Sequence, residues 1–281
     1  MPTRRDALLR LAQWSALGAF APPLVNALRA QPDAAGAIAR GGVQLYTVRA
    51  EMERSVEATL ARVAQVGYRE VEFAGYFGRT PAQVAALLKA NGLTAPSTHI
   101  GVAELSANTP AVLDGLATMG HRYAVIPWLA AEERRTLEQY RRLADRLNEL
   151  GRAAKARGIQ LAYHNHDFEF QPLEGQLPYD LLLARCDADL VKGELDLYWI
   201  NKAGHDPLAY FARHPGRFHL VHVKDLARDG SMTDVGAGML PFARYVAQAA
   251  QAGIRHWFVE RDDARDPFAS ITASLAALRA L

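Results

Sequence analysis

The stretch LGRAAKARGIQLAYHNHD, residues 150–167, holds in order the end of an alanine-rich helical pattern, a glycine, a short strand pattern and a polar cluster. Gly158 is the residue type that ends helices in a left-handed conformation. The run Gln160–His164 is typical of a strand, and His164, Asn165, His166 and Asp167 stand at its end. The stretch therefore predicts a helix that leads into a strand with polar side chains at its carboxyl end.

This strand-and-helix unit repeats eight times after Gly41. The predicted strands are Gly42–Thr47, Glu70–Phe73, Thr94–Ile100, Tyr123–Ile126, Gln160–His164, Val191–Leu195, Phe218–Val223 and Trp257–Glu260. The predicted helices are Ser55–Val66, Pro81–Ala90, Ala111–Met119, Ala131–Arg157, Tyr179–Cys186, Pro207–Phe211, Pro241–Ala252 and Phe268–Ala280. Parallel strands need crossover helices, and eight units of about 30 residues close a barrel. The fold class is therefore α/β, a (β/α)8 TIM barrel in a single domain over residues 37–281.

The N-terminal segment, residues 1–36, reads as a twin-arginine export signal and leader. Arg4 and Arg5 precede a moderately apolar stretch, and the small residue Ala30 suits a cleavage site. An amphipathic helix docked on the barrel is the alternative. A membrane span is disfavoured, because Pro22 and Pro23 interrupt the apolar stretch, which falls short of the roughly 20 residues that a bilayer requires. The expected location is periplasmic.

Charge and cysteine content exclude several classes of protein. The net charge is +2, and the first 30 residues carry four arginines against one aspartate, so the remainder carries −1. The chain after residue 30 therefore lacks the excess positive charge that is typical of nucleic-acid-binding proteins. The single cysteine, Cys186, excludes an intrachain disulfide and a thiolate metal cluster, and core packing is its expected role.

Ligand-type side chains gather at the carboxyl ends of the last four strands, which is where barrels of this kind place their chemistry. One residue from each strand gives the set His164, Asp196, His222 and Glu260. Imidazoles and carboxylates suit Mn²⁺, Co²⁺, Zn²⁺ or Mg²⁺. We therefore expect one divalent metal ion here. Each residue also has an ordinary reading, such as a core histidine or an aspartate that caps the next helix.

Further polar and aromatic residues lie near the same strand ends. His166 and Lys224 share faces with His164 and His222, because side chains alternate along a strand. We expect Glu260, His166 and Lys224 to act as catalytic groups. The expected substrate-binding residues are Glu72, His99, Trp128 and Trp199. The tryptophans would stack on a sugar ring, or else form an aromatic lid over the core.

From Gly41 to Leu281 the chain resembles the xylose isomerase-like barrel superfamily, in particular its sugar phosphate isomerase/epimerase group. The most specific segments are residues 42–49 (GVQLYTVR), 163–170 (YHNHDFEF), 195–199 (LDLYW), 222–225 (HVKD) and 258–260 (FVE). The resemblance implies a metal held by a glutamate, an aspartate, a histidine and a glutamate. Asp196, His222 and Glu260 match, whereas His164 stands at the first glutamate's position. That difference removes one base and puts two-base epimerisation in doubt.

The predicted activity is that of a metal-dependent sugar isomerase or epimerase acting on a keto-sugar through an enediolate. If a leaving group stands on the β-carbon, the same intermediate eliminates, which makes a lyase or dehydratase the alternative. A non-catalytic periplasmic sugar-binding barrel is a second alternative. A relation to the apurinic endonuclease IV group is disfavoured by the charge. A partner sugar oxidoreductase and a homo-oligomer are left open.

Overall fold

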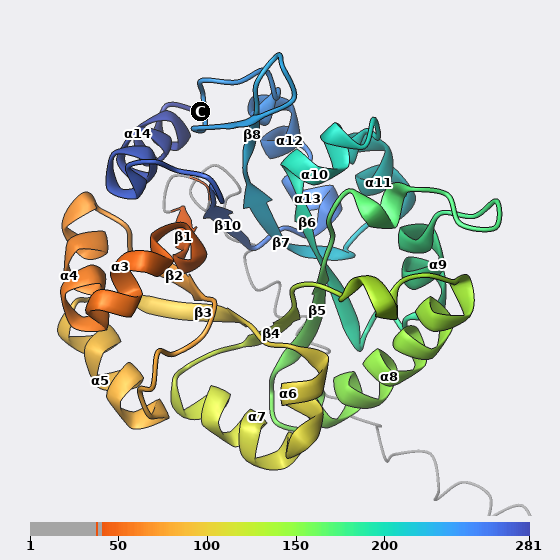
Figure 1. The fold of residues 1–281 in the computed structure, drawn as a ribbon, viewed down its shortest axis with the longest axis horizontal. Helices are drawn as coiled ribbons and strands as arrows, with labels where there is room; N and C mark the ends of the chain where they lie inside the picture. The colour runs from red at the N-terminus through yellow and green to blue at the C-terminus, as the bar shows by residue number, and fades with distance from the viewer. Residues whose placement is uncertain (1–37, 39–40) are drawn as a thin grey trace, which may run out of the picture. The chain divides into compact units, whose positions relative to one another are not determined.

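The computed structural model describes residue 38 and residues 41–281, so the predicted export signal lies outside the described residues. Eight parallel strands form a closed barrel in the order β1-β10-β7-β6-β5-β4-β3-β2 (Figure 1). These strands are β1 (Gly42–Gln44), β2 (Glu70–Phe73), β3 (Thr94–His99), β4 (Tyr123–Ile126), β5 (Gln160–His164), β6 (Val191–Asp196), β7 (Phe218–Val223) and β10 (His256–Val259). The predicted (β/α)8 barrel is confirmed.

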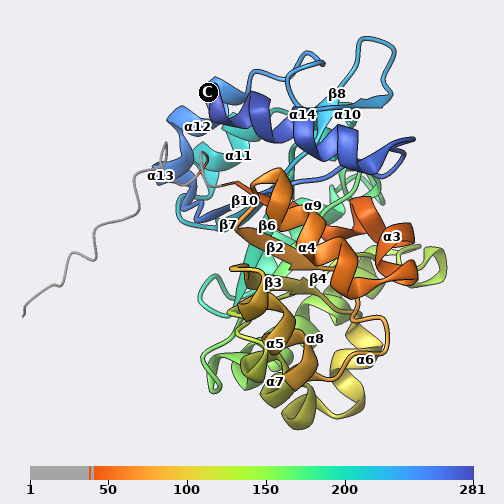
Figure 2. The ribbon, with the colours of Figure 1, turned by 90° about the vertical axis from the view of Figure 1, so that its left-hand side faces the viewer.

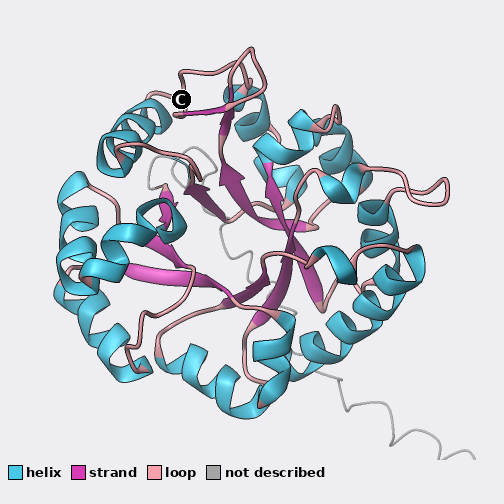
Figure 3. Cartoon of the chain, viewed as in Figure 1, coloured by secondary structure: helices cyan, strands magenta, loops and turns pink. Residues whose placement is uncertain are grey.

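Helices surround the strands (Figure 3). They are α3 (Arg49–Arg54), α4 (Val56–Val66), α5 (Pro81–Ala90), α6 (Val102–Ala107), α7 (Thr109–Thr118), α8 (Leu137–Lys155), α9 (Pro178–Arg185), α10 (Leu197–Lys202), α11 (Pro207–Arg213), α12 (Phe242–Ala247), α13 (Ala249–Ala252) and α14 (Pro267–Arg279). Helix α14 packs beside α4, so the last repeat contacts the first (Figure 2). Among the residues that the structure describes, no helix is long and apolar enough to cross a bilayer.

Several predicted boundaries differ from the structure, most by one or two residues, and the predicted helix Pro241–Ala252 is divided into α12 and α13. Two larger differences have local reasons. Strand β1 ends at Gln44 instead of Thr47, because the Gln44 side chain accepts a hydrogen bond from the Tyr46 backbone N–H (3.0 Å) and turns the chain into the 3₁₀ helix η1 (Leu45–Val48). The long helix starts at Leu137, because Thr136 and Gln139 form a reciprocal capping box there. The six preceding residues include the separate 3₁₀ helix η2 (Ala131–Glu133).

The barrel interior is apolar at mid-strand and polar above it. A separate buried cluster fills the middle of the barrel with Tyr123, Val125, Ala162, Leu220 and Phe258. Side chains on a strand return to the same face every second residue. Two residues beyond Ala162, Leu220 and Phe258 stand His164, His222 and Glu260, so the layer above the apolar cluster carries imidazoles and a carboxylate.

The segment after β7 is organised around one carboxylate. Asp225 accepts hydrogen bonds from the backbone N–H groups of Leu226 (2.8 Å), Gly236 (3.0 Å), Gly238 (3.0 Å) and Leu240 (3.2 Å). A Cβ at Gly238 would collide with the Asp225 carboxylate. The short antiparallel strands β8 (Asp225–Leu226) and β9 (Met232–Thr233) lie within this loop. Asp225 therefore fixes both ends of the loop instead of capping a helix.

We expect Asp225→Ala to loosen residues 226–240. Four charge-assisted hydrogen bonds are lost, so the local opening free energy should fall by about 2 kcal/mol or more. Hydrogen–deuterium exchange of the loop measures this. Asp229→Ala is the matched control, since Asp229 contacts Ser231 within the exposed part of the loop. Equal exchange in both variants would contradict the role assigned to Asp225.

Candidate metal and active site

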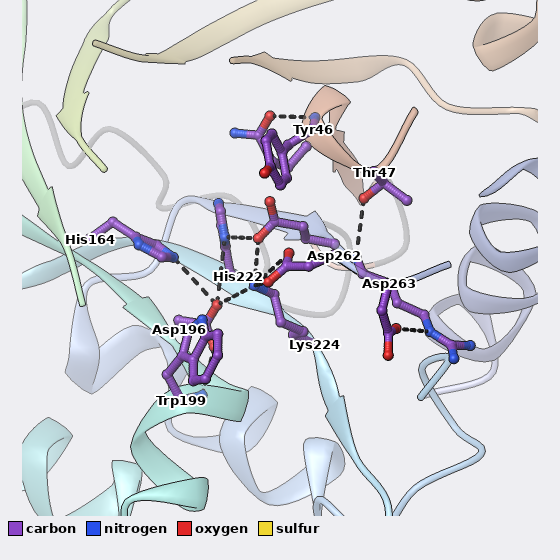
Figure 4. Close-up of polar contacts among 12 residues, drawn as sticks. Tyr46, Thr47, His164, Asp196, Trp199, His222, Lys224, Asp262 and Asp263 are labelled. Atoms are coloured by element: carbon purple, nitrogen blue, oxygen red, sulfur yellow. Dashed lines mark hydrogen bonds and ion pairs between the residues drawn. The ribbon is translucent and has the colours of Figure 1, made fainter. Parts of the chain in front are cut away.

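Four side chains converge above the apolar cluster. They are His164, Asp196, His222 and Glu260, and their ligand-type atoms lie within 4.8 Å of one another. Asp196 Oδ2 is 3.3 Å from His164 Nε2 and 3.8 Å from His222 Nδ1, and His222 Nδ1 is 2.8 Å from Glu260 Oε2. Figure 4 shows His164 and His222 directed at Asp196. All four are buried. We call these residues the outer set.

Strand register brings the outer set together. Asp196 at the end of β6 is paired with His222 on β7, and the Glu260 backbone N–H donates to Val223 O (3.3 Å) just after β10. Asp196 also caps α10, because its Oδ1 accepts from the Trp199 N–H (2.8 Å). Its two oxygens serve different partners, so the capping role and the proposed ligand role are compatible.

Lys224 is buried among carboxylates. Its Nζ lies 2.8 Å from Glu260 Oε2 and 3.1 Å from both Asp196 Oδ2 and Asp262 Oδ1. Burial alone would lower the pKa of Lys224, but the three carboxylates outweigh burial and hold that pKa well above its usual range. Lys224 is therefore an ammonium group that donates hydrogen bonds.

The outer set fits one divalent metal ion. It contains two imidazoles and two carboxylates without sulfur, the composition of many catalytic metal sites. Two nitrogen donors favour Mn²⁺, Co²⁺ or Zn²⁺ over Mg²⁺. His164 is held as a neutral imidazole, because burial and then the neighbouring His222 lower its pKa to about 4. A neutral imidazole is the form that binds metals.

A deeper set of polar side chains lies beneath the outer set. Glu72 Oε2 is 2.7 Å from His222 Nε2, and Glu194 Oε2 is 2.8 Å from His99 Nε2. The carboxylates of Glu72 and Glu194 are fully buried. Burial, and then the charge of Glu72, raise the pKa of Glu194 to about 7. His222 therefore faces Glu260 with one ring nitrogen and Glu72 with the other.

The loop after β5 presents a second imidazole. The His166 ring stacks on Phe168 at 5.3 Å and lies 5.0 Å from the His164 ring. Burial, and then His164, lower the pKa of His166 to about 2, and its Nδ1 has no hydrogen-bond partner among the described residues. The buried Glu169 accepts from the His166 backbone N–H (2.7 Å) and from the Tyr163 hydroxyl (2.6 Å), which fixes the loop.

A cavity of about 590 Å³ opens above these groups, within the usual range for small-molecule sites. His99, His164, His166, Lys224 and Glu260 line its base, and its other lining residues include Tyr46, Glu104, Trp128 and Asp262. Tyr46 and Trp128 are 42% and 52% exposed at its mouth. The cavity is thus polar at the base and aromatic at the entrance.

Residues 60–281 match the model of the xylose isomerase-like TIM barrel. The chain belongs to this family. Its fold places the outer set at the carboxyl ends of the barrel strands, in agreement with the resemblance drawn from the sequence motifs.

Similar proteins include a dehydratase and a sugar phosphate isomerase/epimerase. The chain is 24% identical over 245 residues to an inosose dehydratase of Geobacillus kaustophilus, which covers 72% of this chain and 78% of that protein. A sugar phosphate isomerase/epimerase of Parabacteroides distasonis superposes with a TM-score of 0.74 at 27% identity and covers 85% of this chain and 93% of that one. Several other inosose dehydratases match over about half of their length or less.

A 3-keto-D-glucoside 4-epimerase of E. coli is more distant, with a TM-score of 0.59 at 17% identity over 80% of this chain and 94% of that one. This likeness shows the fold.

Most of the residues predicted from sequence come together, but two lie away from the cavity. Trp128 and His99 line it, whereas Glu72 is buried beneath His222 and Trp199 packs at 5.3 Å from the His166 ring. Position therefore favours a supporting role for Glu72 and Trp199 over direct substrate contact.

The sequence interpretation left out three residues with evident roles at the site: Glu194, Asp262 and Tyr46. Two-residue alternation from Asp196 and Glu260 would have signalled Glu194 and Asp262. Tyr46 carries no such signal, because its position depends on the turn after β1.

We expect the purified chain to bind Co²⁺ through the outer set. His164→Ala should lower the bound Co²⁺ by about one equivalent, measured by elemental analysis and by the visible absorption of cobalt. His256→Ala is the matched control, because His256 pairs with Glu70 (2.9 Å) at the opposite ends of the strands. An unchanged cobalt content in His164→Ala would rule out His164 as a ligand.

Proposed function

We propose that this protein is a metal-dependent isomerase or epimerase that removes a proton next to the carbonyl of a keto-sugar. The observation that carries the proposal is the outer set of ligand-type residues at the base of a sugar-sized cavity, beside the His166 imidazole, whose Nδ1 has no hydrogen-bond partner among the described residues. The family membership and the dehydratase and epimerase relatives support an enzyme of this class.

His164, Asp196, His222 and Glu260 would hold the metal ion. When bound, a divalent ion in this position supplies Lewis acidity toward a carbonyl and an adjacent hydroxyl. The buried surroundings strengthen every electrostatic interaction in the site, because little water competes for the charges.

Proton transfer falls to the groups at the cavity base. His166 is neutral, and its position at the cavity base rather than its basicity makes it a candidate proton acceptor, because burial and His164 lower its pKa to about 2. Glu260 is ionised, since Lys224 and His222 outweigh burial and hold its pKa well below the usual range. Lys224 is an ammonium group that donates toward oxygen atoms and so stabilises the enediolate left by proton removal.

The lining of the cavity favours an unphosphorylated substrate. Among the described lining residues there is no arginine, and the one lysine, Lys224, already contacts three carboxylates. A phosphate group normally requires Arg, Lys or several N–H donors. Tyr46 and Trp128 offer aromatic faces of the kind that sugar rings contact.

Elimination by a lyase or dehydratase is the second candidate. His164 replaces the carboxylate that the family resemblance implies on β5, which leaves fewer bases for returning a proton to the opposite face of the carbon. An enediolate with a leaving group on its β-carbon would then lose that group. The inosose dehydratase relative is consistent with this branch.

We also propose that the protein is exported through residues 1–36 and works in the periplasm, with no nucleic-acid substrate. A sugar oxidoreductase that supplies the keto group would be its functional partner. Assembly into a homo-oligomer remains compatible with the proposal.

We expect the protein to catalyse solvent deuterium exchange into an unphosphorylated keto-sugar or keto-glycoside. Because proton transfer by a positioned group contributes about 10²–10⁴-fold, His166→Asn and Glu260→Gln should each lose at least about 10²-fold in exchange rate. Mass spectrometry of the recovered sugar measures the label. His256→Ala, at the other end of the barrel, should retain the rate.

The same reaction mixtures distinguish the candidates. A product that contains deuterium but is otherwise an isomer of the substrate indicates isomerisation or epimerisation. An unsaturated or cleaved product indicates elimination. Saturable sugar binding with neither label nor product would refute the enzyme proposal and favour a sugar-binding barrel.

A further inference from the structure

Four ligand-type atoms form a second ring inside the barrel, one layer below the outer set. They are Glu72 Oε2, His99 Nε2, Glu194 Oε2 and His222 Nε2, from β2, β3, β6 and β7. We call these residues the inner set. Nitrogen and oxygen alternate around the ring, with consecutive separations of 3.4 Å from Glu72 to His99, 2.8 Å from His99 to Glu194, 3.3 Å from Glu194 to His222, and 2.7 Å from His222 back to Glu72.

We propose that the inner set is a second divalent-cation site and that Zn²⁺ is its natural occupant. In a tetrahedral zinc site with bonds of about 2.0–2.1 Å, neighbouring ligand atoms lie about 3.4 Å apart. Two of the four separations already have this length, and the other two would lengthen by about 0.6 Å. With the inner site alone occupied, two neutral imidazoles and two carboxylates also give a neutral complex with a divalent ion.

A second observation points to a ligand at the inner set. The other oxygen of Glu194, Oε1, is buried and has no hydrogen-bond partner among the described residues. An unsatisfied buried carboxylate oxygen is costly, and a cation bound at Glu194 Oε2 would offset the negative charge that this carboxylate carries.

Surrounding residues fix the carboxylate of Glu72 in the manner of a metal ligand. Gln44 Nε2 donates to Glu72 Oε2 (2.8 Å), and the Ser97 hydroxyl donates to Glu72 Oε1. Such outer hydrogen bonds orient ligands in metalloproteins. His99 lines the cavity and its side chain is 11% exposed, so an ion entering through the cavity meets His99 first.

The inner and outer sets share His222 but use different nitrogens. Nε2 faces the inner set and Nδ1 the outer set, so occupation of both requires the ring to release both N–H protons. The remaining ligands are separate, which permits each site to be removed alone. The inference does not rest on the proposed isomerase activity.

Zinc stoichiometry tests the proposal. The full chain is dialysed against Zn²⁺, freed of excess metal and analysed by inductively coupled plasma mass spectrometry. About two equivalents of zinc per chain are expected. Glu194→Gln keeps the side-chain shape and should lose about one equivalent, as should His99→Ala. His164→Ala should lose the other equivalent, His222→Ala both, and His256→Ala neither.

Anomalous difference density at the zinc absorption edge provides a second readout and should show a peak between the four inner atoms. One equivalent that survives His99→Ala and Glu194→Gln but not His164→Ala would overturn the proposal. One equivalent that survives His164→Ala but is lost in His99→Ala and Glu194→Gln would support the inner site. It would also contradict the metal site on which the proposed function rests. Thermal unfolding of each variant separates loss of metal from loss of the fold.

Discussion

The barrel interior must neutralise the carboxylates that it buries. Glu72, Glu194, Asp196 and Glu260 are almost inaccessible to water, and an isolated carboxylate in such surroundings would take up a proton. Lys224 and the histidines of β3 and β7 provide opposite charge within about 3 Å. This requirement explains the positions of the site residues, because each buried carboxylate forms an ion pair with a lysine or histidine side chain.

The eight-strand barrel increases the need to neutralise these carboxylates, because it places two polar levels, the inner set and the outer set, above the apolar cluster. The middle of β7 contributes Leu220 to the apolar cluster, then His222 to the polar level, and Lys224 follows just beyond the strand. His222 spans both polar levels through its two ring nitrogens. A displacement of that ring would disturb four carboxylates together, so the outer and inner sets constitute one electrostatic unit.

Much of this arrangement could be predicted from the sequence. Strands β2, β4, β5 and β7 have the predicted boundaries, and two-residue alternation assigned the four outer residues to one place. The sequence contained less information about depth. Two-residue spacing along β6 puts Glu194 one step below Asp196, but only the tilt and stagger of the closed barrel bring Glu72 and His99 to the same point as Glu194. Trp128 and Trp199 likewise look equivalent in sequence, yet the loop after β4 exposes Trp128, whereas Trp199 on α10 is half-buried and packs against His166.

The loop after β7 has consequences for how such a barrel can tolerate changes in its sequence. Lys224 and Asp225 are adjacent in sequence but have different roles. Lys224 points into the site, whereas Asp225 anchors both ends of the loop. The tip, residues 228–233, lies between these anchors. The side chains of the tip can therefore be replaced without moving the ammonium group of Lys224. Tolerance of sequence change and preservation of the site are thereby assigned to adjacent positions of the chain.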